Sequence, residues 1–342
     1  MKKYFTLLFS LLMSVHVLYA EIGTCGENLS WNLTDSVLTI NGTGTMDNYD
    51  SYSPRAPWYQ YRESISTVIL SDGITKIGNY AFDHCIHLST IVIPESVKNI
   101  GKSAFAACYS LTSLTIPSSV TSIGVYAFNW VPNIVYSGTA TWQQSNPRWG
   151  ARSLNGIVDG CWVYSDTAQT TLIACSAVAK GDITIPSAVV SIQNYALHSC
   201  MDIISVTIPN SVSQIGLGAF EFCTNLISVT IPSTVTNIGR YCFDECTSLQ
   251  SVFNYSPNPQ TITSDVFDDV NISDCKLYVP EQSVQRYRSS SVWREFVIES
   301  IPPTEVINNI YLDAHPTKVL RNGQVLIIRG DKTYTLQGHA AQ

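Results

Sequence analysis

Hydrophobic and polar residues recur every 23 positions along two stretches of the chain, 65–133 and 180–248. Within most copies, apolar residues fill the fourth, sixth, tenth and thirteenth positions, proline the seventh, glycine the fourteenth, Ala-Phe the seventeenth and eighteenth, and cysteine the twenty-first. The six copies begin at Ile65, Leu88, Leu111, Lys180, Ile203 and Leu226. A period of about 20 to 50 residues is typical of a solenoid, because one copy cannot bury its apolar face alone and stacked copies share a core.

The positions within the repeat predict its local structure. The alternating apolar residues at positions four and six indicate a short strand with one buried face, which proline ends because it has no N–H to donate. Glycine at position fourteen suits a turn that needs a positive φ angle, and Gln193 replaces it in the fourth copy. Ala-Phe fits a short helical or 3₁₀ turn. The predicted fold is therefore a mostly-β, right-handed solenoid of short parallel strands and turn or 3₁₀ segments.

The motif I-P-x-S-V-x-x-I-G-x-x-A-F-x-x-C resembles the leucine-rich repeat of the BspA-like family, which occurs on bacterial and some protist surfaces. Three flanking segments also resemble parts of that family: 23–49 its N-terminal β-hairpin cap, 149–175 its irregular inter-block segment, and 275–296 its C-terminal cap. The resemblance implies a leucine-rich repeat solenoid with β-hairpin caps and a role in adhesion.

Seven segments follow from the repeat and its flanks. They are a signal peptide at 1–20, an N-terminal β cap at 21–64, a first repeat block at 65–133, an irregular β insertion at 134–179, a second repeat block at 180–248, a C-terminal repeat and cap at 249–301, and a linker with a β tail at 302–342.

The N-terminus has the form of a secretory signal peptide. Lys2 and Lys3 precede an apolar run that ends at Leu18, and Ala20 is a small residue at a cleavage position. A membrane anchor is the alternative, but the run is short for a spanning helix. No later stretch is apolar and long enough to span a membrane, so we expect the cleaved chain to be secreted or held at the outer cell surface.

The C-terminal tail has a different composition from the repeats. Asn322-Gly323 and Gly330-Asp331 are strong hairpin turns, so 318–338 is predicted to form a three-stranded β-meander. This segment resembles the sorting tail of cargo for the type IX secretion system of Bacteroidota, which implies contact with that export machinery. The ending His339 to Gln342 departs from the usual pattern. A terminal β-element that packs on the solenoid is the alternative.

Charge narrows the classes of partner. Charged residues make up 13% of the chain, about half the share in an average soluble domain, and the net charge is −7. Nucleic-acid binding is disfavoured because the repeats contain no cluster of basic residues.

The cysteines follow the repeat. Cys200, Cys223 and Cys246 are 23 residues apart, which favours a buried ladder of small apolar side chains over disulfides between stacked copies. Cys161 and Cys175 flank a predicted hairpin and are the better disulfide pair. No His or Cys pair matches Cys242 and Cys246, so we expect no metal site, and no motif indicates a cofactor or a catalytic centre.

The exposed side of the strands is the candidate binding face, with a protein or glycan as partner. It is predicted to carry a nearly uncharged ladder of hydroxyls: Thr90, Ser113, Thr115, Thr184, Ser205, Thr207, Ser228 and Thr230. High β-propensity and solubility also explain such residues. The predicted function is an exported or surface protein that binds host proteins, glycans or other cells. The alternatives are a structural surface-layer component, or an exported carbohydrate-active or other degradative enzyme, with the aromatic residues of 134–179 stacking on sugars.

Overall fold

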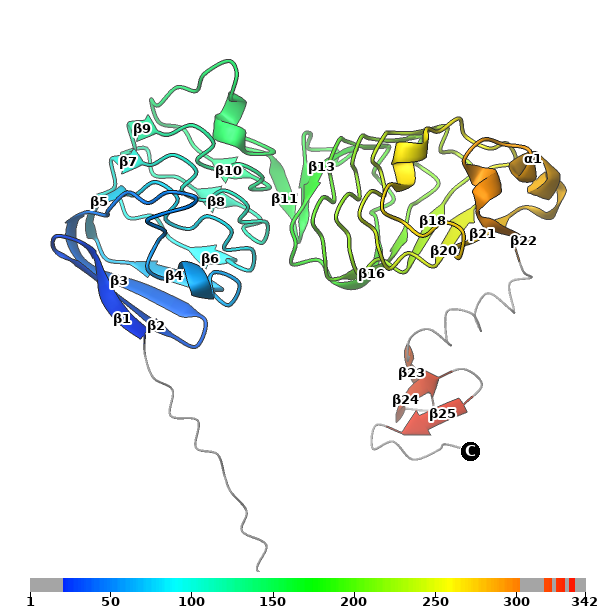
Figure 1. The fold of residues 1–342 in the computed structure, drawn as a ribbon, viewed down its shortest axis with the longest axis horizontal. Coiled ribbons are helices and arrows are strands. Elements are labelled where there is room, and N and C mark those ends of the chain that lie inside the picture. The colour runs from blue at the N-terminus through cyan, green and yellow to red at the C-terminus, as the bar shows by residue number, and fades with distance from the viewer. Residues whose placement is uncertain (1–20, 302–316, 322–323, 330–331, 336–342) are drawn as a thin grey trace, which may run out of the picture. The chain divides into compact units, whose positions relative to one another are not determined.

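The computed structural model describes residues 21–301 and three strands of the tail, 317–321, 324–329 and 332–335 (Figure 1). The predicted signal peptide lies outside the described residues. The chain divides into two compact units between Ala151 and Arg152, inside the segment 134–179. Each unit is a solenoid of its own, with a core of the same repeated side chains. Among the described residues, no helix is both long and apolar enough to cross a membrane.

The first unit begins with an antiparallel meander and continues as stacked parallel strands. In the meander, β1 (Glu21–Gly26), β2 (Leu29–Thr34) and β3 (Val37–Thr45) pair in order. β3 then pairs in parallel with both β4 (Thr67–Leu70) and β5 (Gly73–Ile77), so the meander is joined to the first repeat. The remaining elements are η1 (Tyr59–Tyr61), β6 (Thr90–Ile91), β7 (Asn99–Ile100), β8 (Leu114–Thr115), β9 (Ser122–Ile123), β10 (Ile134–Val135) and η2 (Pro147–Gly150).

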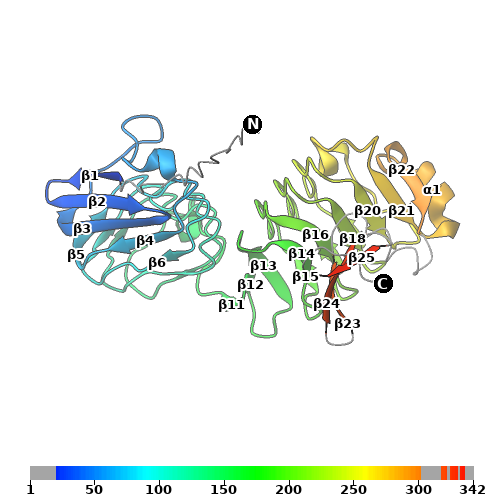
Figure 2. The same ribbon diagram turned by 90° about the horizontal axis from the view of Figure 1, so that it is seen from below.

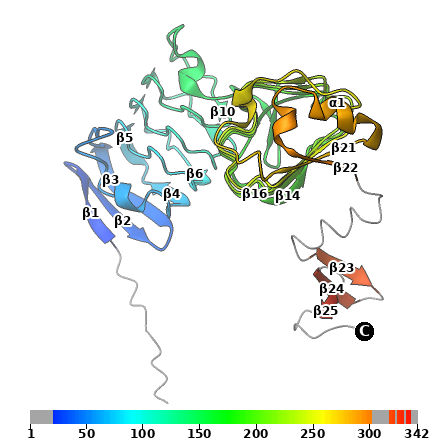
Figure 3. The ribbon, with the colours of Figure 1, turned by 45° about the vertical axis from the view of Figure 1, so that its right-hand side comes forward.

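The solenoid of the second unit contains two sheets, which Figures 2 and 3 show from other sides. The first sheet joins the antiparallel strands β11 (Ile157–Asp159), β12 (Trp162–Tyr164) and β13 (Thr171–Cys175) to the parallel strands β15 (Ser191–Ile192), β17 (Gln214–Ile215) and β19 (Asn237–Ile238). The second sheet is parallel throughout: β14 (Gly181–Thr184), β16 (Ile203–Thr207), β18 (Ser228–Ile231), β20 (Ser251–Asn254), β21 (Lys276–Val279) and β22 (Val297–Ser300). Short helices close the end: η3 (Ser264–Phe267), η4 (Glu281–Ser283), α1 (Val284–Arg288) and η5 (Trp293–Glu295).

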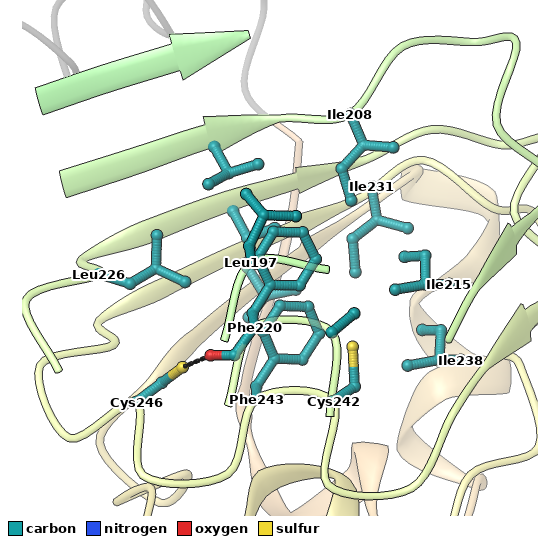
Figure 4. Close-up of a cluster of buried hydrophobic side chains, with 14 of the residues drawn as sticks. Leu197, Ile208, Ile215, Phe220, Leu226, Ile231, Ile238, Cys242, Phe243 and Cys246 are labelled. Atoms are coloured by element: carbon teal, nitrogen blue, oxygen red, sulfur yellow. Dashed lines mark hydrogen bonds between the residues drawn. The ribbon is translucent and has the colours of Figure 1, made fainter. Parts of the chain in front are cut away.

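Identical repeat positions stack on one another in the core (Figure 4). The rings of Phe220 and Phe243 are parallel within 7°, with centroids 5.3 Å apart, and Phe243 stacks on Phe267 at the same spacing. The predicted cysteine ladder is confirmed, since the repeat cysteines are buried thiols. The Sγ of Cys246 donates to the main-chain oxygen of Phe220 at 3.2 Å. The thiols of Cys108 and Cys223 make the same bond to the preceding repeat, to Phe82 O and Leu197 O.

The segment around Ala-Phe forms a third hydrogen-bonded ladder, made of turns in all six copies. In five of the copies, the main-chain N–H groups at positions sixteen, eighteen and twenty donate to carbonyls of the turn that follows, as Phe220 N–H does to Cys242 O at 2.8 Å. In the third copy they donate to Asn146 Oδ1, Trp149 O and Gly150 O. Positions sixteen and twenty have a positive φ in every copy, at 58° in Tyr195 and 59° in Phe222. Non-glycine residues adopt this conformation at a cost of about 1–2 kcal/mol. Here the conformation aims their N–H groups at the neighbouring turn.

The prediction that the repeat glycine supplies a positive φ is wrong. Gly216 and Gly239 do not have positive φ angles. A Cβ on Gly239 would lie 2.4 Å from the main-chain nitrogen of Leu217 in the preceding copy. Glycine is needed because the two main chains approach closely, so the constraint lies between copies and not within one turn.

In the second unit, Arg152 donates hydrogen bonds to the first turn of this ladder. Its guanidinium donates to the main-chain oxygens of Tyr195 at 2.5 Å, Ile173 at 3.2 Å and Asn194. In the fifth and sixth copies, the preceding repeat donates to the carbonyl equivalent to that of Asn194, as Tyr195 N–H does to Leu217 O at 2.7 Å. A side chain therefore takes the place of a missing repeat.

The three described strands of the tail form the predicted meander. β23 (Thr317–Arg321) pairs antiparallel with β24 (Gln324–Arg329), which pairs antiparallel with β25 (Lys332–Thr335).

Candidate interaction surface on the strand face

Three threonines of the second unit lie in one row across adjacent strands of the parallel sheet. Thr184 is paired with Thr207, and Thr207 with Thr230. The neighbouring valines Val206 and Val229 point into the core, so the threonines point outward. Thr184 and Thr207 are exposed and Thr230 is half-buried. We call Thr184, Thr207 and Thr230 the threonine row.

Two predicted members of the face are not exposed. Ser205 and Ser228 are in register with each other, but each is only 7% exposed. Ser205 Oγ donates to Asp182 Oδ1 at 2.6 Å, and the short side chain of Ser228 lies between strands on both sides. Both serines lie too deep between their neighbours to offer their hydroxyls to a partner.

Three predicted members belong to the first unit and do not share a sheet with the threonine row. Thr90, Ser113 and Thr115 are all exposed. Thr90 pairs with Thr67 on β4, whereas Thr115 pairs with Val135 on β10 in a separate two-stranded sheet. The predicted eight-residue ladder is therefore divided between the units, and its continuous exposed part is the threonine row.

Two aromatic residues continue the threonine row onto the next two strands, and they were not predicted from the sequence. Phe253 is paired with Thr230 and Tyr278 with Phe253, and the two rings stack with centroids 4.6 Å apart. Both residues are buried. Phe253 occupies position five of the turn after the sixth copy, where the 23-residue motif fades, so the continuing period is the signal that could have found it.

A shallow groove of about 540 Å³ lies where the same strands begin. Ile204 and Ile227 form its apolar part, and it is completed by Lys180, Gly181, Asp202, Asn225 and Ser248. Ile204 directly precedes Ser205 on β16, so the groove adjoins the strand face. The combination offers an apolar contact beside hydroxyl and amide groups and the charged side chains of Lys180 and Asp202.

The aromatic residues of 134–179 belong to two different structures. In the first unit, Tyr136 and Trp142 each meet the buried Trp149 edge-on, at 5.6 and 5.3 Å between centroids. Tyr164 belongs to the core of the second unit. Within the part of the chain that the structure describes, no group of three His, Cys, Asp or Glu side chains is arranged to hold a metal ion.

Cys161 and Cys175, the predicted disulfide pair, are free thiols in the structure. We propose that they form a disulfide in the exported protein. Ser176 N–H donates to Cys161 O at 2.8 Å, and Trp162 of β12 is paired with Cys175 of β13. Cys161, in the turn just before β12, therefore lies beside the end of β13. A hydrogen bond from the Cys175 thiol lowers the pKa of Cys161, whereas burial raises the pKa of Cys175. Forming the disulfide from the two thiols passes two electrons and two protons to a thiol–disulfide oxidoreductase.

Peptide mapping without reduction tests this pair. After expression in an oxidising compartment, we expect the peptides that contain Cys161 and Cys175 to be linked, and those that contain Cys223 and Cys246 to be separate. A disulfide that closes a loop of this length stabilises a fold by about 3 kcal/mol. Cys161→Ser should therefore lower the free energy of unfolding by about that amount. Recovery of Cys161 and Cys175 as alkylated free thiols would show that the pair stays reduced.

A family model described as BspA type leucine-rich repeat region matches the chain in six copies, over residues 57–137 and 175–290. These ranges cover more than half of the chain. No curated protein matches the chain.

Several solved structures are similar. A leucine-rich repeat protein from Eubacterium ventriosum is 22% identical, with 83% of this chain and 85% of that chain covered and a TM-score of 0.38. A leucine-rich cell surface protein from Faecalibacterium prausnitzii is 18% identical, with 85% and 97% covered and a TM-score of 0.39. The pneumococcal vaccine antigen PcpA is 14% identical, with 82% and 99% covered and a TM-score of 0.37.

Proposed function

The chain belongs to the BspA-type leucine-rich repeat family, and we propose from this that it is an exported interaction protein, secreted or held at the outer cell surface. Its partner is a protein or a glycan, bound through the strand face of the second unit.

The threonine row is the observation that supports this proposal. Thr184, Thr207 and Thr230 present hydroxyl and methyl groups in register on three strands, beside the groove around Ile204 and Ile227. The threonine row gives extended contact with little desolvation of charge, while Lys180 and Asp202 lie at the groove. Because the row itself carries no ionised group, we expect binding to depend little on salt concentration.

Export is part of the same proposal. Residues 1–20 act as a cleaved signal peptide, and 318–338 act as a sorting tail for type IX secretion in a member of the Bacteroidota. The basic residues of the tail, among them Lys318 and Arg321, then serve the export machinery and not the ligand.

A charge-insertion experiment tests the binding face. The double variant Thr184→Lys/Thr207→Lys places two ammonium groups in the row, and we expect it to weaken binding to a retained matrix protein or glycan by at least about tenfold, which is 1.4 kcal/mol. The matched control is Ser187→Lys/Ser233→Lys, which adds the same charge at exposed positions outside the row and should bind within twofold of wild type. The measurement is surface plasmon resonance at low and high salt on immobilised matrix proteins and glycans. Equal binding by both double variants would reject this face.

A further inference from the structure

A second groove, of about 320 Å³, runs over the other sheet of the second unit. One wall consists of the side chains of Ser191, Gln214 and Asn237, which are in register on β15, β17 and β19. Asn194, Leu217 and Arg240 line the opposite wall. Because the residues occupy repeat positions twelve and fifteen, the groove follows the stacking direction of the repeats.

The floor of this groove is main chain. Gly216 and Gly239 contribute no side chain, since their close approach to the preceding copy excludes one. Gln193 occupies the glycine position of the fourth copy, and its Nε2 donates to Ser191 Oγ at 3.1 Å. The groove is therefore open over the fifth and sixth copies and carries a side chain at the fourth.

The wall offers unused hydrogen-bonding groups. Gln214 and Asn237 are exposed, and their side-chain amides make no hydrogen bond with the described part of the chain. Each amide carries both a donor and an acceptor. The one ionised group in the lining, Arg240, is paired with Asp265, with Nε 2.6 Å from Oδ2. What remains for a ligand is uncharged and both donates and accepts.

These features select a class of ligand. A hydroxyl group donates and accepts at once, as an amide does, so a row of amides suits a chain of hydroxyl-bearing units. The amides recur at the strand spacing of about 4.8 Å, close to the length of one sugar ring. An apolar ligand would leave the amides without partners, and an anionic ligand would meet a guanidinium whose charge Asp265 already neutralises. We propose that this groove binds a neutral oligosaccharide, at a site separate from the threonine row.

Calorimetry on the full chain tests the proposal with five probes: cellohexaose, maltohexaose, mannohexaose, hexagalacturonic acid, and a hexapeptide of Ser, Thr and Gly. We expect at least one of the three neutral hexasaccharides to bind at millimolar concentration or below. Gln214→Met/Asn237→Leu removes both amides at nearly constant volume and should weaken that binding about tenfold. Asn210→Leu/Gln250→Met makes the same chemical change at exposed positions outside the groove and should leave binding within twofold.

The outcomes separate the alternatives. Circular dichroism and the thermal midpoint establish that each variant is folded, so a loss of binding reports on the amides. The proposal is overturned if no neutral hexasaccharide binds, if the groove variant binds as well as wild type, or if hexagalacturonic acid or the peptide binds more tightly than every neutral sugar. The last result would assign the groove to an anion or a protein segment.

Discussion

Gly239→Gln is expected to destabilise the second unit severely, whereas the reverse change at the equivalent position, Gln193→Gly, is expected to have little effect. A Cβ on Gly239 would lie 2.4 Å from Leu217 N and 2.6 Å from the carbonyl carbon of Gly216. Both contacts are with main chain of the preceding copy, which cannot move without breaking its own ladder. We expect a loss of about 3 kcal/mol or more in the free energy of unfolding.

The fourth copy tolerates the side chain of Gln193 because no repeat precedes this copy in the second unit. The strand before it is β13 of the irregular segment, and Gln193 N–H donates to Leu172 O there at 2.9 Å. Its side chain is exposed, so replacing it with glycine should change stability by no more than about 1 kcal/mol.

Urea unfolding followed by circular dichroism, together with hydrogen exchange of the amides in β16 and β18, measures both effects. A Gly239→Gln protein as stable as Gln193→Gly would mean that the close approach is not the reason for glycine.

Phe220→Ala should cost about 3–5 kcal/mol, while Phe222→Ala in the same turn should cost no more than about 1 kcal/mol. The ring of Phe220 is fully buried and stacks on Phe243, so its removal leaves a cavity within the aromatic ladder. Phe222 is 36% exposed, and its ring meets the His198 ring edge-on, with centroids 5.5 Å apart. Its φ of 59° is kept by alanine at similar cost.

The two phenylalanine variants form a matched pair, because the same atoms are removed two residues apart. The thermal midpoint of each variant, and the exchange rates of amides in 180–248, give the comparison. Similar losses for both would show that the stacked ring adds nothing beyond general contact.

The repeat itself explains how much of the fold is predictable. The 23-residue period alone predicts which residues of successive copies meet. Examples are the rings of Phe220 and Phe243, which stack, and the Cys246 thiol, which donates to Phe220 O. The role of Gly239 was missed because the pattern of one copy does not show the distance to the next. The left-handed conformation of Tyr195 and Tyr241 was missed because it is stabilised by bonds between copies and not by residue type.

The candidate surfaces were less predictable for a related reason. Alternation along a strand says which residues point outward, and it placed Thr184 and Thr207 correctly. Alternation does not show whether neighbouring residues bury an outward-pointing side chain. The prediction therefore failed for Ser205 and Ser228, which are buried. The groove beside Gln214 and Asn237 depends on what the adjoining glycines leave empty, which becomes visible only when the copies are stacked.

The turn ladder gives the second unit a net dipole along the direction in which its repeats stack. Three N–H groups per copy point toward the C-terminal side and the accepting carbonyls point back, so their peptide dipoles add as they do along a helix. The negative end is formed by ladder carbonyls of the fourth copy, where Asn194 O accepts from the guanidinium of Arg152. The carboxylates of Asp265 and Asp268 belong to the last turn, whose carbonyls accept from Tyr241 and Glu245. The solenoid is thus polarised along its length, with a cation at one end and acids at the other, and its two ends are not equivalent surfaces for a further repeat or an approaching ion.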